Sequence, residues 1–481
     1  MPHSARIGSH GPGQRVLPPL LVSALASLLV ACSGDVVNLG EGMPPPRPPL
    51  PSDSRCLESP TLEDTVIVND QAQLDALEGC ETIKGDLLVR PLFQPDLHPL
   101  RYLTTIEGEL SFDGSFPSLV SPSEFEATPE SIQTVQGVLD AGWITSFDGL
   151  DALERVGALT IRGVAAPDLG PFTLLRSLTG LEGALTLSAL TNVRDLAPLA
   201  HLDGIRTLEI SGPLESIDDL RLPPVMTELS LQACEQLVQV DALRQVKLIK
   251  DVTVSDTGLS DLSGFSNLVE VGDSFGIERN PVLKNLDGLL NLGSVSNSLY
   301  VSGNPLLENI DGLRGLGYAG EVAIEHNDSL TRIAKLLVGG LQSVFIRDNL
   351  SLREVSWFDG MGPPPQLDLP LTPEELLAGA QSLVVTDNPA LEQLVMSPSW
   401  KRIRYAAIEK NASLREVTLG TVQAIDLLSI QGNPVLDTVE LYALATVDSL
   451  HVVDNPLLSE DTFDEVQTFE RQMSGNAAAS P

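Results

Sequence analysis

A short pattern recurs through most of this 481-residue chain and constrains its fold more than any other feature. The pattern is apolar, any, apolar, any, any and then Asn, and it occurs eight times between residues 275 and 455. Successive asparagines are separated by 24, 23, 22, 39, 23, 22 and 22 residues, and such self-similarity is the signature of a solenoid. The asparagines are Asn280, Asn304, Asn327, Asn349, Asn388, Asn411, Asn433 and Asn455.

Each copy of the pattern predicts a β-strand with one face directed inward, because polar and apolar residues alternate along it. The Asn that follows suits a turn, and stacked turns would form an Asn ladder that satisfies buried peptide groups. Asp-Gly at 287–288, 311–312 and 359–360 marks a second corner in the coil. We therefore expect an all-β chain folded as a single parallel β-helix with coils of about 22–24 residues. A leucine-rich-repeat horseshoe is the alternative fold, since it shares the leucine spacing.

Weaker copies of the pattern lie upstream and extend the predicted solenoid over residues 85–455. Two insertions interrupt it, at about 115–143 and 358–379. We expect short helical caps at both ends: an N-terminal cap over 56–84, in which Asp70 caps a helix over residues 71–78, and an amphipathic helix within 456–473. Residues 474–481 read as a disordered tail.

The first 31 residues have the features of a signal peptide, with Arg6 and Arg15 before an apolar run that is too short for a membrane span. The run ends in Leu29-Val-Ala-Cys32, which resembles the lipobox of bacterial lipoproteins. This resemblance implies lipidation at Cys32 and attachment to the bacterial outer membrane or cell surface. Residues 32–55 are rich in proline and predict a disordered, extended tether.

Two strings, Leu299-Tyr-Val-Ser-Gly-Asn-Pro-Leu-Leu-Glu-Asn-Ile-Asp-Gly-Leu313 and Cys80-Glu-Thr-Ile-Lys-Gly-Asp-Leu-Leu-Val89, resemble the receptor L-domain family. The resemblance covers most of residues 56–455. It implies a right-handed β-helix that binds ligands or builds cell-surface structure, and it carries no catalytic motif. The chain departs from receptor ectodomains in its many consecutive coils and its lack of a Cys-rich module, so a peptide-hormone ligand does not transfer.

The cysteines and the charge narrow the function further. Cys56 and Cys80 bracket the predicted N-terminal helix, and in an exported protein they are expected to form a disulfide. With 29 basic and 65 acidic residues the net charge is −36, which argues against nucleic-acid binding. Cys234 occupies the position of the repeating Asn and is expected to be a buried structural residue. We expect no catalytic residues, metal site or cofactor.

The remaining candidate for a functional site is the surface formed by the outward-facing residues of the stacked strands. Tyr300, Glu325, Phe345 and Arg347 are the candidate binding face. The alternative is that the insertion at about 358–379, which leaves from the same region, covers Tyr300 and Phe345. We expect a monomeric, lipid-anchored binding, adhesion or scaffold protein that recognises a protein or glycan through a solenoid face. The alternative is a β-helical carbohydrate-active enzyme, which would need two carboxylates converging in a groove.

Overall fold

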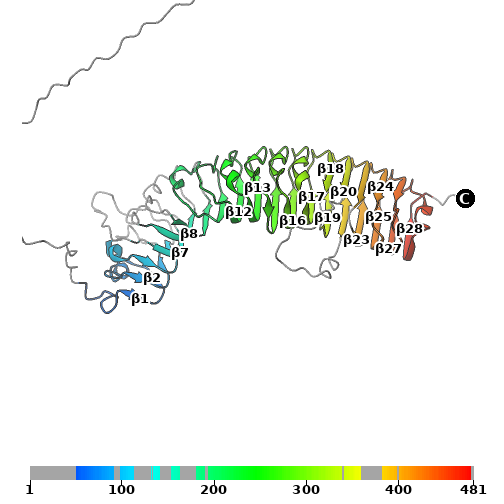
Figure 1. Ribbon diagram of the computed structural model, residues 1–481. Coiled ribbons are helices and arrows are strands. Elements are labelled where there is room, and N and C mark those ends of the chain that lie inside the picture. Colours follow the sequence, from blue (N-terminus) through cyan, green and yellow to red (C-terminus); the bar gives the residue numbers. More distant parts are fainter. Residues whose placement is uncertain are drawn as a thin grey trace, which may run out of the picture. The chain divides into compact units, whose positions relative to one another are not determined.

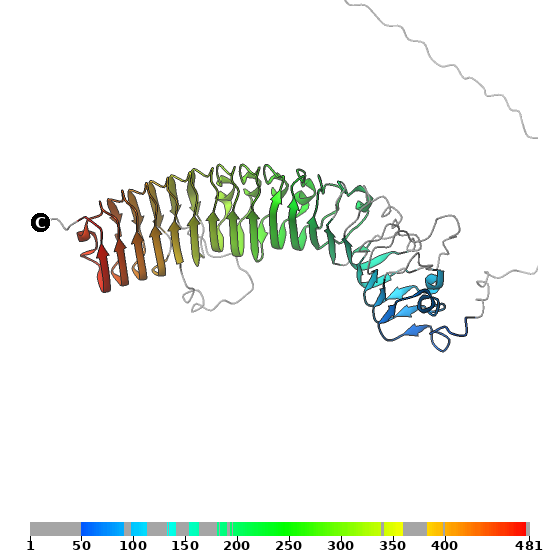
Figure 2. The same cartoon turned by 180° about the vertical axis from the view of Figure 1, so that it is seen from behind.

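The computed structural model describes residues 50–90, 98–112, 132, 134–140, 153–162, 180–181, 183–189, 193–194, 196–337, 341–358, 382–397 and 400–477. They belong to one compact unit that begins at Leu50. The unit is a parallel β-solenoid with coils of about 23 residues, whose strands stack side by side (Figures 1 and 2). The all-β solenoid predicted from the repeat is therefore confirmed.

One long parallel sheet, the main sheet, passes through every coil, because each coil contributes a strand that pairs with the strand of the next. Its strands are β2 (Val66–Val68), β4 (Leu87–Val89), β6 (Leu110–Phe112), β7 (Thr134–Asp140), β8 (Arg155–Arg162), β10 (Ala184–Ser188), β11 (Thr207–Ser211), β12 (Val225–Cys234), β13 (Leu248–Thr257), β15 (Ser274–Glu278), β16 (Ser294–Ser302), β17 (Tyr318–Glu325), β19 (Ser343–Arg347), β21 (Ser382–Thr386), β23 (Arg402–Glu409), β25 (Ala424–Gln431), β27 (Thr446–Val453) and β28 (Gln467–Ser474). Short strands extend it: β1 (Thr61–Leu62), β3 (Thr82–Ile83), β5 (Thr105–Ile106), β9 (Gly180–Leu181) and β14 (Glu270–Val271).

The opposite side of the coils is built in two ways. Between residues 196 and 316, here called the 3₁₀ region, it carries short helices: η3 (Ala197–Leu199), η4 (Asp241–Gln245), η5 (Ser263–Phe265), η6 (Asp287–Leu289) and η7 (Asp311–Gly315). Between residues 318 and 453, the two-sheet region, it carries a second parallel sheet of β18 (Arg332–Leu337), β20 (Glu354–Phe358), β22 (Gln393–Ser397), β24 (Glu416–Leu419) and β26 (Thr438–Glu440). The second sheet follows the upper rim of the stack in Figure 1.

The recurring asparagines form a continuous ladder inside the turns, and all eight are fully buried. Each side chain joins its own coil to the coil before it and to the Asn of the coil after it, as Asn349 shows. The Oδ1 atom of Asn349 accepts the backbone N–H of Asn327 at 3.1 Å, and its Nδ2 atom donates to the carbonyl of Ile324 at 2.9 Å. Asn476, which the repeat did not predict, adds a further rung by accepting the N–H of Asn455 at 3.1 Å. The ladder thus satisfies peptide groups that no water reaches.

The residue before each ladder Asn adopts a left-handed backbone conformation. Its φ is 51° at Arg279, 55° at His326 and 56° at Lys410, while Gly303 and Gly432 fill two of the positions. This conformation disfavours most side chains, so the buried Asn holds the turn in place from one coil to the next.

The N-terminal end is tied down by the predicted disulfide between Cys56 and Cys80. Asp70 caps a helix as expected, accepting the N–H of Gln73 at 2.9 Å, although α1 (Gln71–Asp75) is shorter than predicted. The expected boundaries also shift. Solenoid strands begin at β1 rather than at residue 85, and Leu50–Arg55, assigned to the tether, fold against the first coil, where the hydroxyl of Ser54 donates to the carbonyl of Glu78 at 2.6 Å.

One further boundary differs in the body of the chain. β7 lies inside the predicted insertion at 115–143, so part of that segment belongs to a coil. A 3₁₀ helix, η1 (His98–Tyr102), lies beside α1 in the second coil.

Residues 1–49, including the signal peptide, Cys32 and most of the tether, lie outside the described residues, as do residues 359–381 of the second insertion and residues 478–481. No helix among the described residues is long and apolar enough to cross a membrane.

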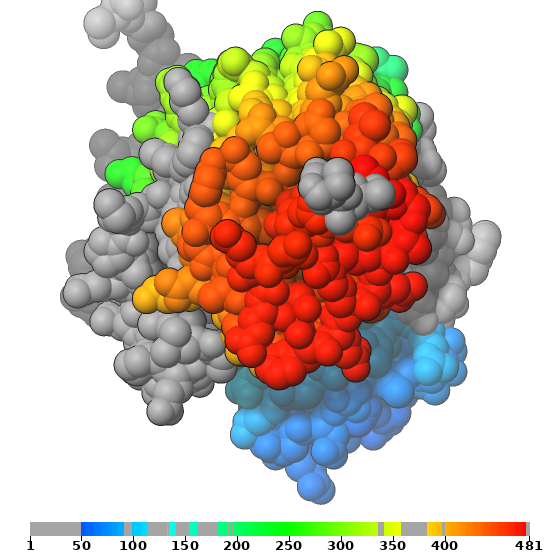
Figure 3. Space-filling model, turned by 90° about the vertical axis from the view of Figure 1, so that its right-hand side faces the viewer, coloured from blue at the N-terminus to red at the C-terminus, as the bar shows by residue number. Residues whose placement is uncertain are grey.

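The predicted helix within 456–473 is wrong. Only η8 (Glu460–Phe463) is helical there, and β28 follows as the last strand of the main sheet (Figure 1). This end of the solenoid faces the viewer in Figure 3. The apolar spacing of Phe463, Val466 and Met473 fits a helix in isolation, but pairing with β27 satisfies the backbone groups along its open edge. Residues 474–477, assigned to the tail, complete this last coil.

Arg471 closes the stack at this end. It pairs in register with Leu450, so it occupies a position that carries a buried apolar residue in the preceding coils. Its guanidinium donates to the carbonyl of Glu460 at 2.7 Å and pairs with Asp464 at 3.4 Å. A charged group directed toward the core column prevents another coil from stacking there.

Candidate binding face on the main sheet

The predicted face residues come together on the outward side of three adjacent strands. Tyr300 on β16, Ala323 on β17 and Phe345 on β19 lie side by side in register. Because neighbouring strands are about 4.8 Å apart, the two aromatic residues are separated by roughly 10 Å at the backbone. Ala323 lies between them and is only 4% exposed, so it forms a small apolar floor.

Phe345 and Glu325 both contact the same cation. The guanidinium of Arg347 lies 4.5 Å from the ring centroid of Phe345, within the range of a cation–π interaction. The same side chain pairs with Glu325 at 3.4 Å. Arg347 and Glu325 are adjacent in register, one strand apart.

Tyr300 is held in a different way. Its hydroxyl donates to a carboxylate oxygen of Glu321 at 3.0 Å. A hydrogen bond with Ser298 favours a lower pKa for the phenol, but burial, the bond to Glu321 and the nearby carboxylate charges outweigh it and raise the pKa. The phenol is therefore protonated at neutral pH and remains a donor.

The structure adds Glu321 to the residues expected from the sequence. We call Tyr300, Glu321, Ala323, Glu325 and Phe345 the Ala323 site. Glu321 and Glu325 flank Ala323 on the same face of β17, since residues two apart on a strand share a face. The sequence carried this signal, because Glu321 stands two positions before Ala323, but the predicted strand began one residue too late to include it.

Cys234 is a structural residue of the turn column. Its thiol is fully buried and donates weakly to the carbonyl of Ile210, the role that the Asn amide has in later coils. Burial raises the pKa of the thiol to about 11. The thiolate that a nucleophile requires is therefore scarce at neutral pH. The neighbouring position in the preceding coil is Pro213, which has no N–H for an Asn oxygen to accept.

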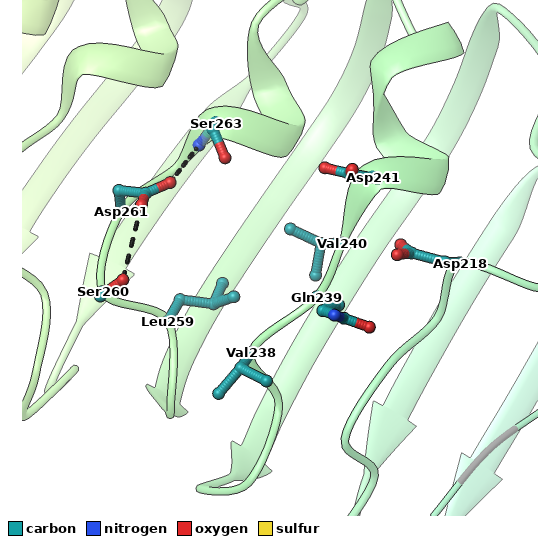
Figure 4. Close-up of a pocket in the computed structure, with 9 residues that line it drawn as sticks. All are labelled: Asp218, Val238, Gln239, Val240, Asp241, Leu259, Ser260, Asp261 and Ser263. Carbon is teal, nitrogen blue, oxygen red and sulfur yellow. Dashed lines mark hydrogen bonds between the residues drawn. The ribbon is translucent and has the colours of Figure 1, made fainter.

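A pocket of about 120 Å³ lies at a coil corner of the 3₁₀ region, with three aspartates beside it (Figure 4). Their carboxylates cap or brace the short helices. Asp261 accepts the N–H of Ser263 at 2.9 Å, Asp218 accepts the N–H of Ala242 at 3.2 Å, and Asp241 pairs with Arg244 at 3.0 Å. The hydrogen bonds from Ser263 lower the pKa of Asp261. These aspartates serve the local fold.

Carboxylates also gather on the outward face of β11–β13. Burial, followed by the charges of Glu209 and Asp251, raises the pKa of Glu228. A shallow pocket of about 160 Å³ nearby is lined by Glu209 and several hydroxyl side chains, but not by Glu228 or Asp251. It therefore holds one carboxylate rather than the pair that glycoside hydrolysis needs. Within the described residues, no three His, Cys, Asp or Glu side chains are grouped to hold a metal.

Comparison with known proteins leaves the family open. No protein-family model matches the chain, and no curated protein matches it. Solved structures similar to it include a chain of the Drosophila Toll–Spatzle complex, with 14% identity, a TM-score of 0.31 and coverage of 86% of this chain. This chain spans 55% of that one. A leucine-rich-repeat protein of Leptospira interrogans has 13% identity and a TM-score of 0.27, and the match covers 77% of this chain and 91% of that one. A leucine-rich-repeat protein of Bacteroides ovatus has 12% identity and a TM-score of 0.16, and the match covers 80% of this chain and 92% of that one.

Two of these similar structures are leucine-rich-repeat proteins, and the chain is a solenoid. At such TM-scores the similarity carries no argument about ligand or function. The fold assignment rests on the strand pairing described above. No family match supports the receptor L-domain or lipoprotein resemblance in particular.

Proposed function

We propose that this chain is a lipid-anchored binding protein of a bacterial cell surface, which recognises a protein or glycan through the Ala323 site. One observation carries the proposal. On the outward face of the main sheet, the aromatic side chains of Tyr300 and Phe345 lie on either side of the small, buried Ala323. Aromatic side chains are among the most frequent anchors of recognition surfaces. The lipobox-like segment ending at Cys32 supports attachment through the N-terminus.

An enzymatic function has less support at this site. Glu321 and Glu325 are four residues apart on one strand, so their backbones are separated by roughly 13 Å, beyond the carboxylate spacing of glycosidases. Each carboxylate already contacts a fixed partner, Tyr300 or Arg347.

The proposal is tested by screening residues 50–481 against arrays of bacterial-surface glycans and of proteins. The double variant Tyr300→Ala/Phe345→Ala is expected to lose at least about 90% of specific binding, which corresponds to about 1.4 kcal/mol. The matched control is Tyr442→Ala/Phe469→Ala, which removes a Tyr and a Phe that are each 74% exposed elsewhere. Equal binding by the two double variants would exclude this face.

The anchor is tested separately in the full-length chain expressed in a bacterial host. Labelling with an alkyne fatty acid is expected to modify the protein, and Cys32→Ser is expected to abolish the label and release the chain from membranes. Fatty-acid incorporation that persists in Cys32→Ser would contradict lipidation at Cys32.

A further inference from the structure

We infer that the Ala323 site binds a basic segment of a partner protein, with a Lys or Arg side chain held against Tyr300 and Glu321. The inference rests on the proposed function, because it names the ligand class of the same face. Four observations carry it: a built-in cation in one half of the site, an approximate symmetry, a missing cation in the other half, and the charge of the chain.

One half of the site already holds a cation supplied by the chain itself. Arg347 lies over the ring of Phe345 and pairs with Glu325. Both contacts favour a guanidinium, since the ring face and the carboxylate are negative. This half therefore shows which chemistry the site accepts.

The two halves are related by an approximate twofold arrangement about Ala323. Tyr300 and Phe345 lie one strand to either side of it, while Glu321 and Glu325 lie two residues to either side along β17. Arg347 lies on the neighbouring strand β19, two residues after Phe345, which is the residue that pairs with Ala323. Its counterpart on β16 is Ser298, which pairs in register with Glu321.

The second half therefore has the ring and the carboxylate but lacks the cation. Ser298 carries no charge, so the chain supplies no cation at the position that is symmetry-related to Arg347. Among the described residues no Lys or Arg pairs with Glu321, whose carboxylate accepts a hydrogen bond from Tyr300. A Lys or Arg side chain from another protein would supply the missing charge.

The net charge favours the same ligand class. With a net charge of −36, the protein attracts basic segments and repels acidic polymers. A neutral glycan would contact the two rings but leave the Glu321 charge without a counter-ion. A basic segment satisfies both the rings and the carboxylate.

The test uses residues 50–481 and fluorescently labelled hexalysine, with binding followed by anisotropy at low ionic strength. Glu321→Gln is expected to weaken binding about fivefold, the loss of one partly exposed ion pair, while the ring of Tyr300 stays in place. Glu465→Gln is the control, because it removes the same charge from an exposed position outside the site and should leave binding unchanged. Fully acetylated hexalysine should bind neither variant.

Two variants distinguish direct binding from general electrostatic attraction. Ser298→Arg supplies the missing internal cation and is expected to weaken hexalysine binding about tenfold or more. Arg347→Gln vacates the occupied half and is expected to strengthen binding about threefold. Ser298→Arg raises the net charge by one unit and Arg347→Gln lowers it by one unit. The control for Arg347→Gln is Arg402→Gln, which lowers the net charge by the same amount outside the site. Thermal melting of each variant checks that the fold is retained.

The outcomes separate the inference from the proposed function. Equal hexalysine binding by Glu321→Gln and Glu465→Gln, or unchanged binding by Ser298→Arg in a folded protein, would overturn the basic-segment inference. If a neutral glycan then binds in a manner that depends on Tyr300 and Phe345, the proposed function stands without it. If no array ligand depends on those two residues either, both proposals fail.

Discussion

The 3₁₀ region and the two-sheet region share one main sheet and one Asn ladder, yet they build the back of the coil differently. In the 3₁₀ region the back carries a short helix, as in η7, whereas in the two-sheet region it carries a second strand, as in β18. The main sheet passes from one region to the other without a break between β16, β17 and β19. The back of the coil is thus set locally, coil by coil.

The change can be followed through two successive coils. Asn309-Ile310-Asp311-Gly312 in one coil corresponds to Arg332-Ile333-Ala334-Lys335 in the next. Asn309 accepts the N–H of Asp311, the first residue of the short helix, at 3.2 Å, and Arg332 instead pairs in register with Glu354 as part of a strand. Losing this Asn and the Gly removes the support for a 3₁₀ turn and leaves an extended chain that pairs with its neighbour.

The largest expected effect tests what the two regions share. Asn304→Ala and Asn411→Ala each remove a ladder amide, one from each region, and each leaves a buried N–H and a buried carbonyl without a partner. Each should lower the free energy of unfolding by about 3 kcal/mol, measured by urea denaturation of residues 50–481. Costs that differ by more than about 1 kcal/mol would show that the back of the coil influences the turn.

A smaller effect tests what separates the regions. A Cβ atom added at Gly312 would lie 1.7 Å from the carbonyl oxygen of Leu286, so Gly312→Ala must push two coils apart. It should lower the free energy of unfolding by about 2 kcal/mol. The control is Gly317→Ala, where the nearest atom is 3.6 Å away and the cost should stay within about 0.5 kcal/mol. Equal costs would mean that close coil packing does not require glycine in the 3₁₀ region.

The smallest effect concerns charge on the outward face. In the two-sheet region Arg402 pairs with Asp426 at 2.5 Å and with Asp448 at 3.3 Å, whereas in the 3₁₀ region Glu228 faces Glu209 and Asp251. Because the folded-state pKa of Glu228 is raised, folding becomes less favourable as pH rises and this carboxyl ionises. Glu228→Gln should therefore raise the melting temperature slightly at pH 7 and leave it unchanged at low pH.

A matched variant keeps this test specific. Glu235→Gln removes the same charge from an exposed position of the following turn. It should change the melting temperature less than Glu228→Gln at pH 7. If the two variants shift it equally, the effect reflects net charge rather than the crowding of Glu209, Glu228 and Asp251.

Much of the fold was predictable because the spacing of the ladder asparagines in the sequence equals the length of one coil. Each must meet the next across one coil, so a buried amide at position 327 requires another at 349. The C-terminal coil was not predictable in this way. Arg471 stands where the pattern requires an apolar residue, so the pattern is broken before Asn476. For the 3₁₀ helices, the sequence predicted only a corner at each Asp-Gly. The Asp-Gly pair does not specify which backbone hydrogen bonds follow it.

The candidate site was predictable in part. Tyr300, Glu325, Phe345 and Arg347 follow from the outward alternation of strands whose register the repeat determines. The ion pair and the ring contact of Arg347 depend on side-chain conformations that no pattern encodes. Glu321 was missed because the strand extends beyond the repeating hexad, and the importance of Ser298 appears only through the arrangement about Ala323.

The ladder has a consequence for how such a chain changes length over evolutionary time. Each interior rung presents the same donor and acceptor to the coil before and the coil after it. Duplication or deletion of one whole coil would therefore rejoin matching partners, and the register of the remaining coils would survive. Arg471 differs, because it places a charged group in the core column of the last coil. Gain or loss of coils should therefore be confined to the interior while the terminal coil stays fixed.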